Sequence, residues 1–314
     1  MIVLGSAYRG VTVRLREHVS SSHTIRDPDP QRPIDSQLAD VEVLLLGSLR
    51  VTAEVMDAAP RLRLIHQHGR GIDGVDLEAA TARGVWVANV PQGNSVAVAE
   101  HALGLMFVLA KGIHRARASL ENAELGAPLT TELSGATLGI LGLGGSGSEL
   151  ALRAKALGMR VLATKAEPQR CSVPHSVDKL VGPAEVDGVL AESDFIVVAL
   201  PLTDATLGSI GRESIARMKP TASLINIARA QIVDYDALYE ALAENRISGA
   251  AFDVFWGEPA NVRDPLLELP NFVLTPHQAG FSYRSVDDVA QVIADNIERL
   301  DAGAPLHNTV VSGR

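Results

Sequence analysis

The sequence predicts an α/β protein built from two doubly wound parallel-sheet domains. Short runs rich in valine, isoleucine and leucine recur along the chain and mostly do not alternate with polar residues, which is typical of strands covered on both faces. Helix-like segments separate these runs, as parallel strands require. The length of 314 residues also suits two domains of ~150 residues each.

The elements follow one another in a regular order. Strands are expected at 2–4, 43–46, 62–65, 85–88, 137–141, 160–163, 195–200, 223–227, 249–252 and 272–275. Helices are expected at 76–83, 95–111, 147–157, 212–218, 236–244 and 287–300. The polar, proline-bearing stretch 20–33 is typical of a surface connection.

One helix-like segment breaks the alternation. Residues 95–111 are long and mostly apolar, and no clear strand follows them until residue 137. A long helix between two sets of strands is expected where the chain crosses between domains, and helix 287–300 would then cross back. The sequence therefore predicts two domains, of which the first is discontinuous.

Composition and charge exclude several classes of protein. The chain carries 28 Lys and Arg against 37 Asp and Glu, a net charge of −9, so neither a nucleic-acid nor a membrane partner is expected. The single cysteine, Cys171, excludes an internal disulfide and a cysteine-based zinc site, and no metal is expected. The start of the chain lacks the basic and apolar regions of a signal peptide, so we expect a cytoplasmic protein.

A glycine motif follows the strand expected at 137–141 and opens a helix. In this context Gly142-x-Gly144-x-x-Gly147 is the fingerprint of dinucleotide binding. Gly142 permits the tight turn, Gly144 lets the backbone approach the pyrophosphate, and Gly147 lets the helix pack on the strand. The pyrophosphate would meet the positive end of the helix. The alternative for such a triplet is an ordinary tight turn.

The residue after the second strand of this set bears on which dinucleotide binds. An acid there bonds the ribose 2′-hydroxyl of NAD, whereas a cation accommodates the 2′-phosphate of NADP. Lys165 occupies that place, with Arg170 nearby, which favours NADP(H). Two alternatives stay open: Lys165 is a solvated surface charge, or Glu167 serves as the acid.

Polar residues follow three further apolar runs of the same set. Arg229 follows one run, Asp253 and Glu258 follow the next, and His277 follows the last. Ligands in open α/β sheets bind at these carboxyl ends of strands. An arginine, carboxylates and a histidine placed together there indicate acid–base chemistry on an anionic substrate.

With these motifs the sequence resembles the D-isomer-specific 2-hydroxyacid dehydrogenases, a family that includes D-lactate, glyoxylate/hydroxypyruvate and phosphoglycerate dehydrogenases. The matching stretches cover almost the whole chain: 69–76, 94–103, 137–147, 201–203, 226–229, 253–259, 275–280 and 308–310.

The resemblance implies an oxidoreductase that transfers a hydride between NAD(P) and a 2-oxo or D-2-hydroxy acid. It also implies a Rossmann cofactor domain, residues 97–284, inserted in a discontinuous flavodoxin-like substrate domain, residues 1–96 and 285–314.

The family's catalytic roles fall on three residues. His277 would donate a proton to the carbonyl oxygen of the acid, Glu258 would fix the orientation of the histidine, and Arg229 would bind the substrate carboxylate. No covalent step is implied, so Cys171 is not expected to act as a nucleophile. Besides Gly142, Gly144, Gly147 and Lys165, the expected cofactor-binding residues are Gly145, Ser146, Pro201, Thr206, Ala228, Asp253 and Gly280. Asp253 would lie near the nicotinamide amide.

The family's substrate loop corresponds to a glycine-rich segment of the first domain. The expected substrate-binding residues are His68, Gly69, Arg70, Gly71 and Asn94. An apolar residue is common at the position of Arg70. The arginine therefore either reads a second anionic group of the substrate or faces solvent. Trp256 also departs from the family pattern and would either narrow the pocket or pack at its mouth.

Two other functions stay open on this fold. One is a formate- or phosphite-type dehydrogenase, and the other is a non-catalytic NAD(P)H-sensing scaffold of the corepressor type. Members of the family are usually homodimers joined through the cofactor domain. The resemblance therefore also implies a homodimer, with residues 95–120 as its arm.

Overall fold

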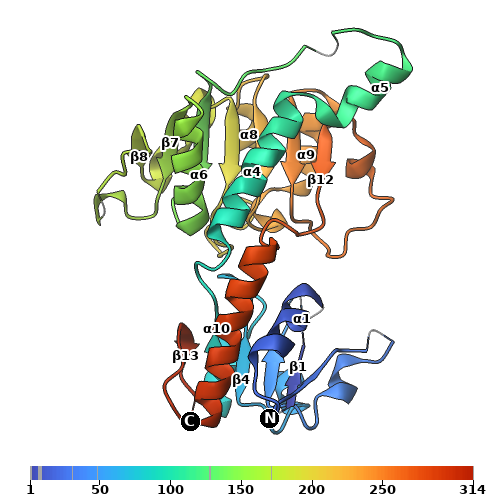
Figure 1. Cartoon of the computed structure of the whole chain (residues 1–314). Coiled ribbons are helices and arrows are strands. Elements are labelled where there is room, and N and C mark those ends of the chain that lie inside the picture. Colours follow the sequence, from blue (N-terminus) through green and yellow to red (C-terminus); the bar gives the residue numbers. More distant parts are fainter. Residues whose placement is uncertain are drawn as a thin grey trace. The chain divides into compact units, whose positions relative to one another are not determined.

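The computed structural model describes residues 2–5, 9–29, 31–47, 49–126, 129–170 and 172–313. Cys171 lies outside them. The chain divides into two compact units (Figure 1). The first unit is Met1–Asn94 with Gly280–Arg314, and the second unit is Ser95–Ala279.

The first unit contains a six-stranded sheet in the order β13-β5-β4-β3-β1-β2. The strands are β1 (Ile2–Leu4), β2 (Thr24–Arg26), β3 (Val43–Leu45), β4 (Leu64–His66), β5 (Trp86–Ala88) and β13 (Thr309–Val311). Only β13 runs antiparallel to its neighbour, β5. The order 2-1-3-4-5 of the parallel strands is that of flavodoxin, which confirms the predicted fold class of this part.

Helices cover both faces of this sheet. They are α1 (Arg9–His18), α2 (Ala53–Asp57), α3 (Leu77–Arg83) and α10 (Tyr283–Asp301), with a 3-10 turn, η1, at Ile34–Gln37. Val43 and Leu45 pack in one core with residues of α1 and α10, whereas Leu44 packs in a second core with residues of α2 and α3. The alternation of strand side chains thus supplies both cores.

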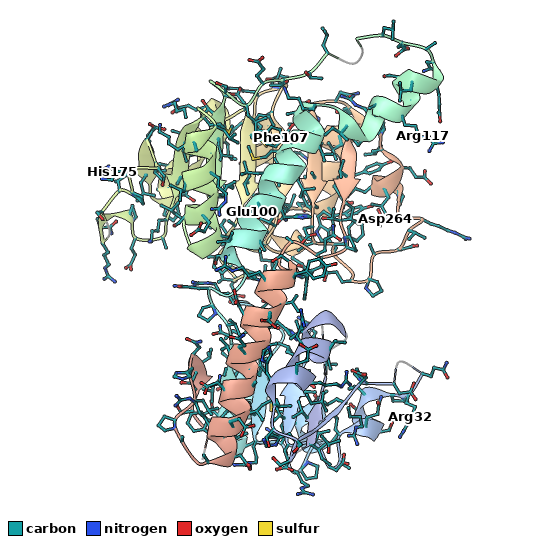
Figure 2. The ribbon with its side chains drawn as sticks, viewed as in Figure 1. Arg32, Glu100, Phe107, Arg117, His175 and Asp264 are labelled. Atoms are coloured by element: carbon teal, nitrogen blue, oxygen red, sulfur yellow. The ribbon has the colours of Figure 1, made fainter. Side chains whose placement is uncertain are left out.

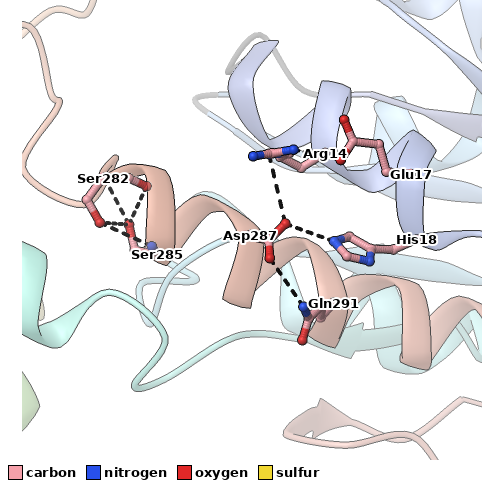
Figure 3. Close-up of polar contacts among 7 residues, drawn as sticks. All are labelled: Arg14, Glu17, His18, Ser282, Ser285, Asp287 and Gln291. Carbon is pink, nitrogen blue, oxygen red and sulfur yellow. Dashed lines mark hydrogen bonds and ion pairs between the residues drawn. The ribbon is translucent and has the colours of Figure 1, made fainter.

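Helix α10 begins with a capping box. The Ser282 hydroxyl accepts from the Ser285 N–H at 3.1 Å, and the Ser282 N–H donates to Ser285 Oγ at 2.9 Å (Figure 3). Further along, Asp287 Oδ1 lies 2.9 Å from His18 Nε2. The hydrogen bond from His18 lowers the pKa of Asp287. These contacts fix where α10 begins and how it pairs with α1.

The second unit contains a seven-stranded, wholly parallel sheet in the order β12-β11-β10-β9-β6-β7-β8. Its strands are β6 (Thr137–Leu141), β7 (Arg160–Thr164), β8 (Lys179–Val181), β9 (Phe195–Val198), β10 (Ser223–Asn226), β11 (Gly249–Phe252) and β12 (Phe272–Leu274). This is the Rossmann order, which reverses between β6 and β9. The predicted Rossmann fold is confirmed.

The helices of the second unit also lie on both faces. They are α4 (Ser95–Ala110), α5 (Ala116–Glu121), α6 (Gly145–Ala156), α7 (Val186–Glu192), α8 (Arg212–Ala216) and α9 (Tyr235–Ala243). Short 3-10 turns lie at Ile113–Arg115, Pro168–Arg170, Pro183–Glu185, Ala230–Ile232 and Pro265–Glu268. Helices α4 and α6 run side by side on one face (Figure 1). Their apolar residues pack with Leu138 and Ile140, whereas Leu141 packs with α7, α8 and α9 on the other face.

Helix α4 is the most apolar of the described helices, and much of it is buried in this core. No single helix in the described ranges has the length and apolar character needed to cross a membrane. Helix α4 and the segment Ile113–Glu121 are bent by 54° relative to each other. Together they have the length and apolar composition of a membrane span, on those two criteria only.

Candidate active site

The turn between β6 and α6 admits only glycine at its first position. Gly142 has a φ of +106°, and its N–H donates to Thr164 Oγ1 at 3.1 Å. A Cβ at Gly142 would lie 2.6 Å from the carbonyl oxygen of Ala199. The close approach of β9 and the left-handed backbone therefore exclude a side chain here.

The next residues leave an open cradle at the start of α6. Gly144 is the N-cap of the helix, with no side chain capping it, and a Cβ there would meet nothing within 4 Å. A Cβ at Gly145 would lie 2.5 Å from Ser95 Oγ, and one at Gly147 would overlap the carbonyl oxygen of Gly142. Ser146 lies in the first turn of the helix. Open space beside unsatisfied helix N–H groups fits a dinucleotide pyrophosphate.

The end of β7 presents one cation. The N–H of Lys165 donates to the Val181 carbonyl at 3.0 Å, and its half-buried side chain makes no ion pair with a described carboxylate. Glu167, the alternative ribose ligand, is bonded to Arg170 at 2.9 Å. Glu167 thus already has an ion-pair partner.

Two further predicted cofactor residues lie in one loop after β9. The Thr206 hydroxyl donates to the Pro201 carbonyl at 2.7 Å and accepts from the Thr203 N–H at 2.8 Å. Thr206 therefore closes the loop on itself. Its side chain reaches the backbone of Pro201, so the two residues lie together.

A histidine and a glutamate meet at the carboxyl edge of the second unit's sheet. His277 Nδ1 lies 2.7 Å from Glu258 Oε2. Because a carboxylate oxygen accepts, Nδ1 carries the proton. Glu258 Oε1 accepts from the Phe255 N–H at 3.1 Å. Burial alone would raise the pKa of Glu258, but the hydrogen bond and charge of His277, the Phe255 N–H and the charge of Arg229 together lower it.

The backbone of His277 is itself unusual. Its φ is +53°, and its N–H donates to the Thr275 carbonyl at 2.9 Å. Left-handed backbone is uncommon for residues other than glycine and tends to occur at functional sites. The tight turn aims the imidazole ring at Glu258.

Asn226 shapes the turn that presents Arg229. Its Nδ2 donates to the Arg229 carbonyl and its Oδ1 accepts from the Ala228 N–H, both at 2.9 Å. Arg229 Nη1 donates to the Ala228 carbonyl at 2.8 Å. The charge of Arg229 also contributes to lowering the pKa of Glu258.

Asp253 and Trp256, which precede Glu258 in the chain, are bonded to or packed against other residues of the second unit. Asp253 is buried, and its oxygens accept from the Thr275 hydroxyl at 2.5 Å and from the N–H groups of Gln278 at 2.9 Å and Ala279 at 2.8 Å. Trp256 stacks on Phe252 and donates from Nε1 to the Val233 carbonyl at 3.0 Å. From the sequence, Trp256 is expected either to narrow the pocket or to pack at its mouth. Its contacts with Phe252 and Val233 are those of a packed side chain.

Four of the five predicted substrate residues lie in the first unit directly after β4, and the fifth, Asn94, follows β5. Gln67 Nε2 donates to the Gly71 carbonyl at 2.9 Å, and Gln67 Oε1 accepts from the His68 N–H at 2.8 Å. The Gly69 carbonyl accepts from the Val90 N–H at 3.2 Å. His68 is buried, whereas Arg70 is exposed. The loop is thus held by Gln67, to which sequence reasoning assigned no binding role.

Gly280 and Asn94, predicted to bind cofactor and substrate respectively, are neighbours in the first unit. A Cβ at Gly280 would overlap the side-chain amide of Asn94. A small cavity of about 20 Å³ nearby is lined by both residues and by His68. The absence of a side chain at Gly280 therefore makes room for the amide.

Comparisons with known proteins identify the family of this chain. The family model described as D-isomer specific 2-hydroxyacid dehydrogenase, NAD binding domain, matches residues 103–279. The D-3-phosphoglycerate dehydrogenase of Archaeoglobus fulgidus is 39% identical over 270 residues, which are 85% of this chain and 51% of that protein. The glyoxylate reductase of Korarchaeum cryptofilum is 36% identical over 285 residues, 88% of this chain and 84% of that protein.

Solved structures show the same architecture. The D-lactate dehydrogenase from Aquifex aeolicus, complexed with NAD and lactic acid, has a TM-score of 0.84 and 26% identity over 100% of this chain and 99% of that chain. The chain spans about half the length of the curated phosphoglycerate dehydrogenases that it matches.

Fold and site together define a protein class: a two-domain α/β protein with a Rossmann unit for a nicotinamide dinucleotide. Within this class, the chain belongs to the D-isomer specific 2-hydroxyacid dehydrogenase family.

Proposed function

We propose that the protein interconverts a 2-oxo acid and a D-2-hydroxy acid with a nicotinamide cofactor. The observation that carries this proposal is the His277–Glu258 pair, with 2.7 Å between Nδ1 and Oε2; the charge of Arg229 also contributes to lowering the pKa of Glu258. A histidine oriented by a carboxylate suits proton transfer, and an arginine suits binding of a substrate carboxylate. Family membership supports the same reaction.

His277 supplies the proton in this proposal. Glu258 holds the proton of Nδ1, so Nε2 is the ring nitrogen that gives a proton to the carbonyl oxygen, or takes it back from the hydroxyl. When bound, the nicotinamide supplies or accepts the hydride at C2 of the acid. The lowered pKa of Glu258 keeps its carboxylate charged, which stabilises the positive ring before the proton leaves.

Arg229 binds and orients the acid. Its guanidinium can donate two parallel hydrogen bonds to one carboxylate, which fixes the substrate more firmly than a lysine would. The Asn226 clamp on the neighbouring backbone holds the arginine at the end of β10. We assign cofactor binding to the cradle of Gly142, Gly144 and Gly147 and to the other predicted cofactor residues, with Asp253 near the nicotinamide amide.

The proposal is tested by NAD(P)H consumption with a panel of 2-oxo acids. His277→Asn removes the proton donor while keeping a residue that tolerates positive φ, and should lower kcat by about 10²–10⁴-fold. His114→Leu, a histidine change elsewhere in the second unit, should keep the activity. Tight cofactor binding with no turnover of any acid would favour a sensing scaffold, and turnover of formate or phosphite alone would favour that second reaction.

We also propose that Lys165 favours NADP(H). Lys165 stands at the end of β7, and Glu167 is already bonded to Arg170. Lys165→Asp should shift the ratio of kcat/KM values toward NADH by about tenfold or more, because it replaces a cation with a ribose-binding acid. A strong NADH preference in the unaltered protein would overturn this assignment.

We assign two further features. Arg70 recognises a second anionic group of the substrate, since its side chain is exposed and makes no ion pair with a described carboxylate. The protein forms a homodimer through the second unit, because Ile113, Leu120, Leu125 and Leu129 are all exposed on or beside α5. Helix α5, which carries Arg117, projects away from the body of its unit (Figure 2).

A further inference from the structure

A second histidine of the second unit lies close to the loop that carries His277. His101 belongs to α4, and its side chain is only 19% exposed. Its Nε2 atom is 2.9 Å from Thr275 Oγ1 and 3.4 Å from Asp253 Oδ1. Nothing in the proposed reaction requires this histidine, so its contacts need an explanation of their own.

The directions of these hydrogen bonds follow from their chemistry. Asp253 Oδ1 can only accept, so the Thr275 hydroxyl donates to it over 2.5 Å. Having given its single proton away, Thr275 Oγ1 accepts from His101, whose Nε2 therefore carries a hydrogen. The result is a chain of donors that runs from α4 through Thr275 to Asp253.

Asp253 fastens the segment on both sides of His277. Before His277 it bonds Thr275, and after it Asp253 accepts from the N–H groups of Gln278 and Ala279. Asp253 is 2% exposed, and a buried carboxylate must keep such partners to remain in place. Glu258 holds the ring of His277, and Asp253 holds the backbone on which that ring stands.

We propose that His101 is a positioning residue for His277. By donating to Thr275 it directs the threonine hydroxyl at Asp253, and Asp253 then holds residues 275–279 in the tight turn that gives His277 its left-handed backbone. The kinetic consequence rests on the proposed function. The structural consequence, the fastening of residues 275–279, does not.

Four variants test the chain of donors. His101→Leu and Thr275→Val each remove one link, and each should lower kcat by about tenfold, with little change in KM for the acid, because a small displacement of the proton donor impairs the chemical step. The double variant should lose no more than the more impaired single variant, since both act through one chain. His101→Gln keeps an N–H donor near the position of Nε2 and should recover most of the loss.

His114→Leu is the matched control, since His114 is also a partly buried histidine of the second unit, and its ring nitrogen Nδ1 lies 3.2 Å from the Val108 carbonyl oxygen. This variant should lower stability without lowering kcat.

The second readout is hydrogen exchange of a peptide spanning residues 275–279, measured on the full chain without substrate. His101→Leu should speed this exchange about fivefold, the effect of losing roughly one hydrogen bond.

The two readouts separate the two proposals. Faster exchange in His101→Leu, in a protein that turns over no acid, would sink the proposed function and keep the positioning role. Normal turnover together with unchanged exchange in His101→Leu would overturn the positioning role. An equal loss in His101→Gln and His101→Leu would also overturn it, because a donor would then not be what matters.

Discussion

At the scale of single residues, the site depends on backbone conformation as much as on chemical groups. The φ of +53° at His277 is tolerated because Asp253 bonds the amides that follow it. Strain of this kind persists only where the surroundings compensate for it. A substitution that disturbs Asp253 should therefore impair the proton donor without touching the imidazole.

Two buried histidines make the first unit sensitive to acid. Burial lowers the pKa of His66 to about 4, and burial together with the charge of His66 lowers the pKa of His68 to about 3. The neutral ring of His66 is satisfied, since Nδ1 donates to the Gln67 carbonyl and Nε2 accepts from Asn296 Nδ2. A proton on Nε2 would remove that acceptor.

The lowered pKa values of His66 and His68 make the folded protein less stable in acid. In the unfolded chain both histidines titrate near pH 6.5, so below that pH the unfolded state binds more protons. The free energy of unfolding is therefore retained above about pH 6.5 and falls as the pH drops toward 4 and then 3, by about 1.4 kcal/mol per pH unit for each histidine. Urea unfolding between pH 7.5 and 4.5 measures this slope. His66→Gln should remove one histidine's share, and an unchanged slope would contradict the assignment.

Arg70 offers a test of substrate class. If it reads a second anionic group, Arg70→Ala should raise KM for a dianionic 2-oxo acid by about tenfold or more and leave KM for pyruvate or glyoxylate nearly unchanged. Arg32→Ala, at an exposed arginine elsewhere in the first unit, serves as the control. Equal increases for both kinds of acid would leave Arg70 without a role in selecting substrate.

At the scale of elements, the β6–α6 turn separates stability from cofactor binding. A Cβ at Gly144 would meet nothing of the protein within 4 Å, so Gly144→Ala should fold normally yet lose dinucleotide affinity, because the methyl group occupies the space of the pyrophosphate. Gly188→Ala, inside α7 and equally unobstructed, should gain about 0.5–1 kcal/mol of stability and bind cofactor as before. Fluorescence titration with NADH and NADPH measures the affinity. Unchanged NADH and NADPH affinity in Gly144→Ala would contradict the proposal that the pyrophosphate binds beside Gly144.

The sequence predicted best those elements whose cause is local. Short apolar runs predicted the central strands β6, β9, β10 and β11. Predicting 20–33 as a surface connection was wrong in part, because β2 lies within it and pairs in register with β1. That strand, TIR, has no apolar run of its own and forms by extending an existing sheet edge. Helix α1 was missed in the same way, since its packing against α10 is specified by residues far along the chain.

In the candidate site, too, the sequence predicts residues that follow a local motif better than residues that depend on distant contacts. Arg229, Glu258 and His277 lie at predicted strand ends, and the geometry brings Glu258 and His277 within 2.7 Å. Sequence reasoning assigned no site role to Gln67, Thr164 or His101, although His101 lies in the matching stretch 94–103, because each acts by bonding another residue's backbone or hydroxyl. Contacts of that kind depend on three-dimensional proximity, which spacing in the sequence does not encode.

At the scale of the whole molecule, an acidic chain must still attract two anionic ligands. The net charge is −9. Many of the described arginines are already neutralised by carboxylates, as Arg26 is by Asp40 and Arg83 is by Asp57. Lys165 and Arg70 make no such pair with the described residues. Positive potential is therefore expected where the dinucleotide and the acid are proposed to bind.

The exposed apolar segment around α5 predicts the state of assembly. If it joins two copies, the protein should sediment at twice the chain mass of 33.2 kDa, and Leu120→Glu with Leu125→Glu should give monomers, since burying two carboxylates in an apolar interface is unfavourable. Val13→Glu, at an exposed valine of the first unit, should leave the mass unchanged. A monomeric unaltered protein, measured by analytical ultracentrifugation, would contradict the dimer.

The discontinuity of the first unit has a consequence for synthesis on the ribosome. Its core needs Val289, Ile293 and Ile297 of α10, which emerge only after the whole of the second unit, Ser95–Ala279, has been made. At typical rates of translation this is a delay of roughly 10–40 s. The sheet of the first unit can therefore complete its packing only after the second unit has been made, and during that interval its apolar face is what a chaperone would meet.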